Sequence, residues 1–156
     1  MIDTANSETH EGESSATAAA IVTLARAHID EMFAHARRVS PEECCGLIGG
    51  SGQTSTCVYQ LRNTASDARV RYEASPEDLF AAQKQMRVRG EKLLAIYHSH
   101  PRDAEPVPSE TDVRLAFYPH AIYFIIGFCD EHTPVLRAFH INAGQKRWAA
   151  IEFRIA

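Results

Sequence analysis

Apolar and polar positions alternate along the chain with periods that predict both helices and strands. A first amphipathic helix is expected over residues 18–38, because apolar side chains recur there every three or four positions. The apolar positions are Ile21, Leu24, Ala25, Ile29, Met32, Phe33 and Ala36. His28 and His35 lie in this segment and are expected at its surface or boundary. Pro41 disfavours helical geometry at Ser40, so the helix should end there.

Two further helices are predicted to begin at a serine followed by acidic residues. Ser75 is placed as an N-cap with Pro76 at the first helical position, and Gly90 is placed to close that helix. Acidic residues in the first turn suit the helix dipole. A third helix is expected to begin at Ser109 and to end near Pro119. The chain therefore has three predicted helices.

Short apolar runs bounded by turn residues predict the strands of one sheet. They are CCGLIGG (44–50), TCVYQLRN (56–63), LLAIY (93–97), AIYFIIGFC (121–129), VLRAFHI (135–141) and WAAIEFRI (148–155), with VRYEA (70–74) as an additional short strand. The continuous run 121–129 is expected to be central, whereas the alternation within 148–155 predicts one buried face and one in water. The expected fold class is α/β: a single domain with a mixed, mostly antiparallel sheet of six or seven strands and three helices.

Length and charge narrow the class of protein. A chain of 156 residues fits one domain with a core of its own. The net charge of −4, without a Lys/Arg cluster, speaks against a nucleic-acid or membrane partner. No run approaches the roughly 20 apolar residues of a membrane span. The polar, acidic residues 1–16 are expected to form a flexible N-terminal tail, which leaves residues 17–156 as the domain.

The cysteines and the start of the chain favour a cytoplasmic protein. Cys44, Cys45, Cys57 and Cys129 match neither a CxxC motif nor paired zinc knuckles, so they are expected to be reduced thiols. Cys57 and Cys129 are expected in the core. The residues before the apolar patch near residue 18 are acidic, which excludes the positive start of a secretory signal.

Residues 96–112, IYHSHPRDAEPVPSETD, carry the candidate chemistry. His98 and His100, at i and i+2 near a strand end, point to the same face, and Asp112 falls in the first turn of the third predicted helix. Two histidines and one carboxylate leave a fourth position for water, which is the composition of a catalytic zinc site. Taken singly, Ser109 and Asp112 also fit a structural capping box. The same three ligands occur in non-haem Fe(II) oxygenases, although the helix signals speak against an all-β scaffold.

HSHP followed by SETD resembles the signature of the JAMM (MPN+) zinc metalloproteases. The resemblance covers about residues 18–156 and implies a JAMM/MPN fold, which is cytidine-deaminase-like. It further implies that one Zn²⁺ per chain is bound by His98, His100 and Asp112.

The resemblance also implies two catalytic residues. Glu43, within SPEECCGLIGG, matches the position of the catalytic glutamate, with Glu42 as the neighbouring alternative. Ser109 matches the serine that assists the transition state. The eight residues between His100 and Ser109 are one more than the usual family spacing, and a loop can absorb one residue at small cost.

Within that family the short chain looks like the small bacterial members that act on ubiquitin-like sulfur-carrier proteins. Such an enzyme hydrolyses the bond after a C-terminal Gly-Gly and releases cysteine or another amino acid. The Gly-Gly tail is expected to pair with an exposed strand edge near the metal. A thiol-based sulfur-transfer protein using Cys44 or Cys45, and a noncatalytic scaffold of the same fold, stay open as alternatives. A homodimer also stays open.

Overall fold

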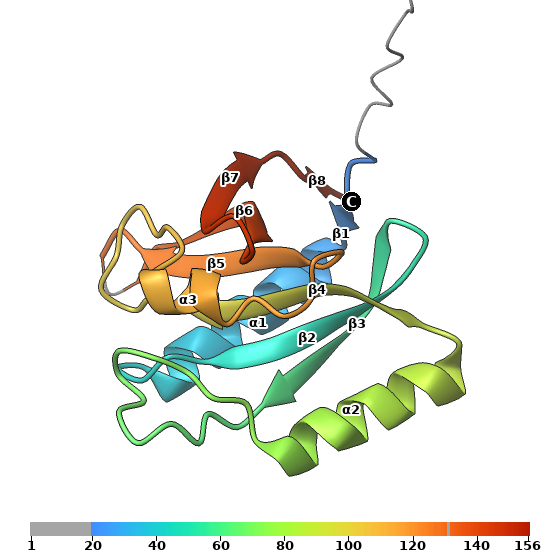
Figure 1. The fold of residues 1–156 in the computed structure, drawn as a ribbon, viewed down its shortest axis with the longest axis horizontal. Helices are drawn as coiled ribbons and strands as arrows, with labels where there is room; N and C mark the ends of the chain where they lie inside the picture. The colour runs from blue at the N-terminus through green and yellow to red at the C-terminus, as the bar shows by residue number, and fades with distance from the viewer. Residues whose placement is uncertain (1–19, 131) are drawn as a thin grey trace, which may run out of the picture.

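The computed structural model describes residues 20–130 and 132–156, so the tail predicted at residues 1–16 lies outside the described residues. The described residues form an eight-stranded sheet with three helices (Figure 1). The strands are β1 (Thr23–Leu24), β2 (Cys45–Ser51), β3 (Thr54–Leu61), β4 (Lys92–Ser99), β5 (Ile122–Phe128), β6 (Pro134–Asn142), β7 (Arg147–Ile151) and β8 (Arg154–Ile155). The helices are α1 (Arg26–Val39), α2 (Pro76–Arg89) and α3 (Glu110–Arg114). The α/β class is confirmed, whereas the strand number is eight rather than six or seven.

The strand order across the sheet is β7-β6-β5-β4-β2-β3-β1-β8. β4 pairs antiparallel with β2 and parallel with β5, so the sheet is mixed, as predicted. β5 is an interior strand, but the middle of the sheet is occupied by β4 and β2. The residues at the end of β4 are therefore enclosed by strands on both sides.

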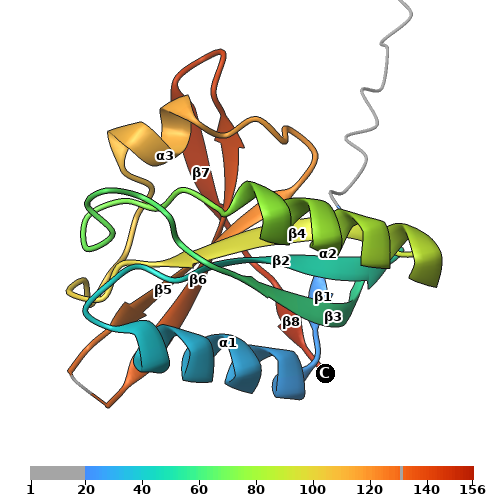
Figure 2. The same cartoon turned by 90° about the horizontal axis from the view of Figure 1, so that it is seen from below.

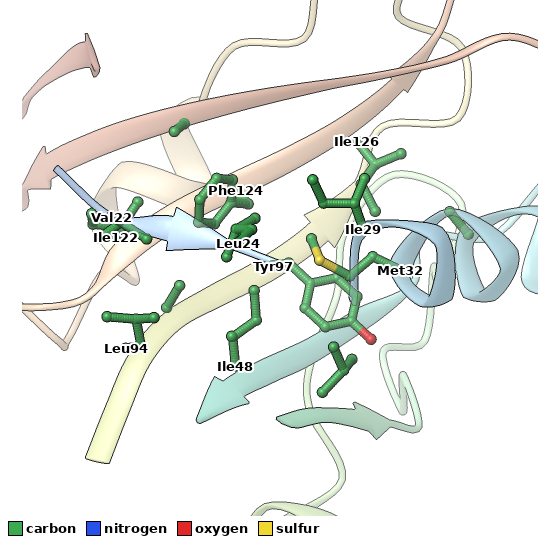
Figure 3. Close-up of a cluster of buried hydrophobic side chains, with 14 of the residues drawn as sticks. Val22, Leu24, Ile29, Met32, Ile48, Leu94, Tyr97, Ile122, Phe124 and Ile126 are labelled. Carbon is green, nitrogen blue, oxygen red and sulfur yellow. The ribbon is translucent and has the colours of Figure 1, made fainter. Parts of the chain in front are cut away.

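The helices lie on both faces of the sheet, with α1 on one side and α2 and α3 on the other (Figure 2). Side chains of β4 alternate between the two: Tyr97 packs with Ile29 and Met32 of α1 (Figure 3), and Ile96 packs on the α2 side. His98 follows this alternation and points to the same face as Ile96. Among the described helices, none is long and apolar enough to span a membrane.

The first helix begins later than predicted. Residues before Ala25 are extended because Thr23 pairs with Thr54 on one side and Arg154 on the other. Leu24 is therefore fully buried as part of β1 rather than as part of a helical face. Apolar spacing alone cannot separate a helical turn from a short buried strand.

The strand predicted over residues 148–155 is divided into β7 and β8, which lie at opposite ends of the sheet. Ile151 in β7 pairs with Ala138 of β6, whereas Ile155 in β8 pairs with Leu24 of β1. The alternating residues 151–155 thus bridge two sheet edges instead of lining one face.

The second helix matches its prediction, whereas the third helix is shorter than expected and one predicted strand does not form. Ser75 Oγ accepts a hydrogen bond from the main chain of Asp78, and Gly90 closes α2 in the left-handed conformation. The third helix ends at Arg114 rather than near Pro119. Residues 70–74 do not form a strand and contribute only one isolated bridge, between Asn63 and Ala74.

His35 is buried against the sheet, so its predicted surface position is wrong. Its Nδ1 lies 2.8 Å from the hydroxyl oxygen of Tyr97. The Tyr97 ring lies directly over Gly46, where any Cβ would overlap it. His28 is half-buried, with Nδ1 2.7 Å from Ser55 Oγ. An amphipathic pattern does not reveal this environment, because the partner tyrosine is 62 residues away.

The buried His35 is expected to make the metal-free protein less stable in mild acid. Burial, with a smaller effect of Arg38, lowers the pKa of His35 to about 4. Because the unfolded chain binds this proton near pH 6.5, stability falls as pH drops from 6.5 towards 4, by about 3 kcal/mol in total. Urea unfolding at pH 7 and pH 4.5 should show this loss in wild type and much less of it in His35→Gln. Equal losses in the two proteins would contradict the assignment.

Candidate metal centre

The end of β4 brings two imidazoles together on the α3 side of the sheet. His98 pairs with Cys45 of β2 and Ile125 of β5, and its side chain is fully buried. His100 follows two positions later, with a side chain that is 11% exposed. Their Nε2 atoms lie 3.0 Å apart. The i, i+2 spacing on a strand therefore aims both rings at one point.

The N-terminus of α3 adds a carboxylate to this pair. Ser109 Oγ accepts from the Asp112 main-chain N–H (3.0 Å), and Asp112 Oδ2 accepts from the Ser109 N–H (2.8 Å), which completes a capping box. The same Asp112 Oδ2 lies 3.1 Å from His98 Nε2 and 3.2 Å from His100 Nε2. The cap and the histidine contacts share one oxygen, so the capping box orients this carboxylate.

The proline-rich loop 101–108 holds α3 over the end of β4. The Asp103 carbonyl accepts from Phe128 N of β5 (2.8 Å), and the Pro106 carbonyl accepts from Arg137 Nη1 of β6 (3.1 Å). The eight-residue loop is thus held on the neighbouring strands, and with this loop length Asp112 contacts both His98 and His100.

The three donor atoms fit a zinc ion. His98 Nε2, His100 Nε2 and Asp112 Oδ2 form a triangle with sides of 3.0, 3.1 and 3.2 Å. Ligand atoms around tetrahedral Zn²⁺, with bonds of roughly 2.0–2.1 Å, lie about 3.3–3.4 Å apart. The donors would need to spread only slightly. A set of two imidazoles and one carboxylate also leaves the fourth position free, as in catalytic sites.

The environment of His98 and of Asp112 favours the protonation state that binds a cation. Burial lowers the pKa of the His98 imidazole. Burial alone would raise the pKa of Asp112, but hydrogen bonds with His100 and His98 hold it well below its ordinary value. A neutral imidazole and an ionised carboxylate are the forms that coordinate metals. Burial alone would lower the pKa of His100, but its hydrogen bond with Asp112 and the neighbouring carboxylates raise it, so a cation would have to displace this proton.

Two side chains outside the triangle fix the imidazole rings. Asp103 Oδ2 lies 3.3 Å from Nδ1 of His100, on the side of the ring away from the triangle. The Tyr72 ring lies over His98 at a centroid distance of 4.6 Å and an angle of 30°. Partners of this kind hold the orientation of metal-binding histidines. The sequence did not indicate either residue, because both lie in irregular loops, and Tyr72 was instead assigned to a strand.

Glu43 is buried beside the triangle, whereas Glu42 is exposed. Glu43 Oε1 lies 3.8 Å from His100 Nε2, and Oε2 is buried without a hydrogen-bond partner among the described residues. Burial raises the pKa of Glu43 to about 7, against a smaller opposing effect of His100. A carboxyl with a pKa near neutrality can both take up and release a proton.

A mostly apolar cavity of about 260 Å³ opens beside Asp112. Its lining includes residues 71–74, and residues of α3 and the segment after it, among them Leu115 and Phe117. The strand that carries His98 offers no free edge, because β4 is paired with β2 on one side and with β5 on the other. The cavity reaches the triangle at Asp112, and the pairing of a Gly-Gly tail with another strand edge stays a prediction.

Cys44 and Cys45 are poorly suited to act as nucleophiles. Cys44 and Cys45 are buried, and burial raises the pKa of each thiol to about 12, so neither forms a thiolate near neutral pH. This disfavours the thiol-based alternative. Cys57 is half-buried and Cys129 is exposed, so the predicted core position of Cys129 is wrong. All four cysteines are free.

Comparison with known proteins assigns the chain to a family. Residues 25–142 match the family model described as prokaryotic homologs of the JAB domain. The chain belongs to this family. The resemblance to the JAMM metalloproteases is thereby confirmed at the level of the family, and this JAB-domain protein contains the His-His-Asp set that a noncatalytic scaffold would lack.

Three relatives are identical to this JAB-domain protein at about a third of the aligned positions. The desampylase of Haloferax volcanii is 34% identical over 67% of this chain and 78% of its own length. The CysO-cysteine peptidase of Mycobacterium tuberculosis is 32% identical over 74% of this chain and 80% of its own. A probable TtuB-protein conjugate cleaving protease of Thermus thermophilus is 33% identical over 81% and 80%.

A solved structure supports the fold. Protein DSY2949 from Desulfitobacterium hafniense superposes with a TM-score of 0.75 and 34% identity, covering 87% of this JAB-domain protein and 93% of its own chain. The arrangement of the sheet and helices is therefore shared across nearly the whole length of both proteins.

Proposed function

We propose that this JAB-domain protein is a zinc-dependent peptidase and isopeptidase that hydrolyses the bond after the C-terminal Gly-Gly of a ubiquitin-like sulfur-carrier protein. The observation that carries the proposal is the buried Glu43 carboxyl, 3.8 Å from one imidazole of the His98, His100 and Asp112 triangle. A structural zinc site is closed by four protein ligands and does not require a buried carboxyl beside them. The arrangement therefore favours hydrolysis.

Each site residue has a distinct role in this mechanism. His98, His100 and Asp112 would hold Zn²⁺, which when bound polarises a carbonyl and lowers the pKa of water. Glu43 takes the proton of the attacking water on its carboxylate and later passes it to the leaving amine. Burial of Glu43, which raises its pKa to about 7, suits both transfers at neutral pH.

Ser109 assists the transition state in the proposed mechanism. Its Oγ accepts from the Asp112 main chain, which leaves the hydroxyl proton free to donate. In the mechanism it donates to the carbonyl oxygen as negative charge develops there. Donors of this kind act mainly in the transition state.

Replacing Ser109 by Ala is expected to lower kcat by about 10²–10³-fold, because an oxyanion donor is lost. The lost cap should also cost about 1 kcal/mol of unfolding free energy. Ser75→Ala is the matched control, since Ser75 caps α2 through the same main-chain contact, to Asp78. It should show a similar stability loss with a much smaller fall in kcat, as measured by carrier cleavage and urea unfolding. Similar kcat values for the two variants would remove Ser109 from the mechanism.

The names of the relatives and the shape of the cavity support the substrate class. The relatives include a CysO-cysteine peptidase and a probable protease for TtuB-protein conjugates, which differ in what is attached to the carrier. A cavity of about 260 Å³ lies below the roughly 300–1,000 Å³ typical of small-molecule sites. It suits a thin chain end rather than a folded segment.

The test is cleavage of a sulfur-carrier protein followed by intact mass. One substrate extends the Gly-Gly terminus by cysteine, a second joins it to a lysine side chain, and a control replaces the last glycine by valine. Zinc-loaded protein should remove the extension from the first two, and a chelator should prevent this. Survival of both glycine substrates with zinc-loaded protein would overturn the proposal.

We further propose that the reaction takes place in the cytoplasm, without a nucleic-acid or membrane partner. The four free thiols and the net charge of −4 support this setting. Release of cysteine from its carrier would make the enzyme part of cysteine biosynthesis.

A further inference from the structure

We propose that Asn63 is a positioning residue, which ties the main chain of Glu43 to the loop that covers the metal ligands. This loop, residues 62–75, connects β3 to α2 and is called the 62–75 loop below. The inference rests on the function proposed above, and it adds a residue that touches neither metal nor substrate.

The nitrogen and the oxygen of the Asn63 side-chain amide both form hydrogen bonds. Its Nδ2 donates to the carbonyls of Glu43 and Arg71, both at 3.0 Å, with the Ala68 carbonyl at 3.4 Å. Its Oδ1 accepts from the N–H groups of Ala65 and Glu73, each at 3.0 Å. Two donated and two accepted bonds use both hydrogens and both lone pairs of the amide. No other side chain supplies this set at this length.

Both main-chain polar groups of Glu43 form hydrogen bonds with the 62–75 loop. Its carbonyl accepts from Asn63, and its N–H donates to the Ala68 carbonyl of the 62–75 loop (2.7 Å). Apart from the side chain, both polar groups of Glu43 therefore depend on a loop that Asn63 organises. A shift of this loop would move the carboxyl relative to the triangle.

The same loop forms the cover and one wall of the site. Arg71, which Asn63 binds, precedes Tyr72, whose ring lies on His98. Residues 71–74 line the cavity beside Asp112. Main-chain hydrogen bonds join the two arms of the loop, from Thr64 N to the Glu73 carbonyl (2.8 Å) and from Ser75 N to the Arg62 carbonyl (2.9 Å), and the Asn63 side chain adds the bond to the Glu43 carbonyl. Asn63 thus links the cavity wall, the ligand cover and the catalytic glutamate.

A purely structural role is the competing explanation, and Asn142 provides a matched control. Asn142 Oδ1 accepts from Gln145 N (3.0 Å) in the turn between β6 and β7, away from the triangle. Asn142→Ala removes a comparable turn contact without touching the 62–75 loop. It should leave kcat and KM unchanged.

Two substitutions separate the donor side of Asn63 from its acceptor side. Asn63→Ala should lower kcat by roughly 10²-fold, the effect of a misplacement of about 1 Å, and should raise KM. Asn63→Asp keeps the acceptor for Ala65 and Glu73 but loses the donors. The kcat of Asn63→Asp should fall as far as that of Asn63→Ala, whereas its KM should be closer to the wild-type value. Both variants should purify with one zinc per chain, and assays well below the unfolding temperature exclude loss of folded protein.

Hydrogen exchange gives a readout that does not need turnover. In Asn63→Ala, the amide of Glu43 should exchange faster together with those of Ala65 and Glu73, while helix α2 keeps wild-type protection. Unchanged exchange at Glu43, or a folded, zinc-loaded Asn63→Ala protein with wild-type kcat, would overturn the proposal. If wild type cleaves no carrier, the substrate proposal fails, but faster exchange at Glu43 would still support the anchoring by Asn63.

Discussion

Glu43→Gln is expected to lower kcat by about 10²–10⁴-fold while one zinc per chain remains bound. Glutamine has nearly the same shape but cannot take up the proton of the attacking water. Glu43 is 5% exposed and is not part of the donor triangle, so its replacement should leave the three proposed metal ligands in place. Carrier cleavage followed by intact mass, with metal content determined on the same sample, measures both quantities.

The adjacent Glu42 is the matched control for this experiment, because it has the same side chain but is exposed. Glu42→Gln should cleave the carrier at the wild-type rate. A Glu43→Gln protein that loses its zinc would show that Glu43 acts as a ligand rather than as the base. Wild-type turnover in Glu43→Gln would remove general-base catalysis by this residue altogether.

Asp112→Asn is expected to abolish zinc binding and to reduce cleavage to background. The side-chain oxygen of asparagine can still accept from the Ser109 main chain, so the helix cap is largely preserved. The negatively charged oxygen that lies near both His98 and His100 is lost. Zinc at 100 times its dissociation constant should raise the unfolding free energy of wild type by about 2.7 kcal/mol, and of Asp112→Asn much less. Urea unfolding with and without zinc measures the difference.

Asp78→Asn is the control for the loss of a carboxylate at a helix start. Asp78 occupies the same place in its Ser-x-x-Asp sequence at the start of α2, where it binds Arg62 rather than histidines. This variant should keep the zinc-dependent gain in stability and wild-type cleavage. Full zinc occupancy and activity in Asp112→Asn would refute the proposed ligand set, since the two remaining imidazoles would then suffice.

The comparison of these two Ser-x-x-Asp segments shows the limit of local sequence. Both start a helix, and in both the serine accepts from the main chain of the aspartate. Only the second lies over the end of β4, where Asp112 reaches His98. The motif therefore predicts a helix start in each case, while the chemistry depends on which strand the helix covers.

The sequence by itself determined those features whose causes are local. Helix α2 follows from the Ser75 cap, Pro76 and Gly90, because capping and backbone preference act within a few residues. His98 and His100 share a face because strand side chains alternate with a period of two. The family could be predicted from the sequence because its signature is also local: a short run of residues in one loop and the helix start that follows it.

Only the tertiary structure decided the features that depend on distant partners. Residues 148–155 separate into β7 and β8 because β6 binds one half and β1 the other. His35 is buried because Tyr97 lies opposite it, and Glu43 is next to the triangle because β2 pairs with β4. Asn63 and Tyr72 lie in an irregular loop with no periodicity to mark them. Contacts between residues far apart in the chain set burial, and burial sets the pKa of Glu43, so its chemistry appears only in the folded protein.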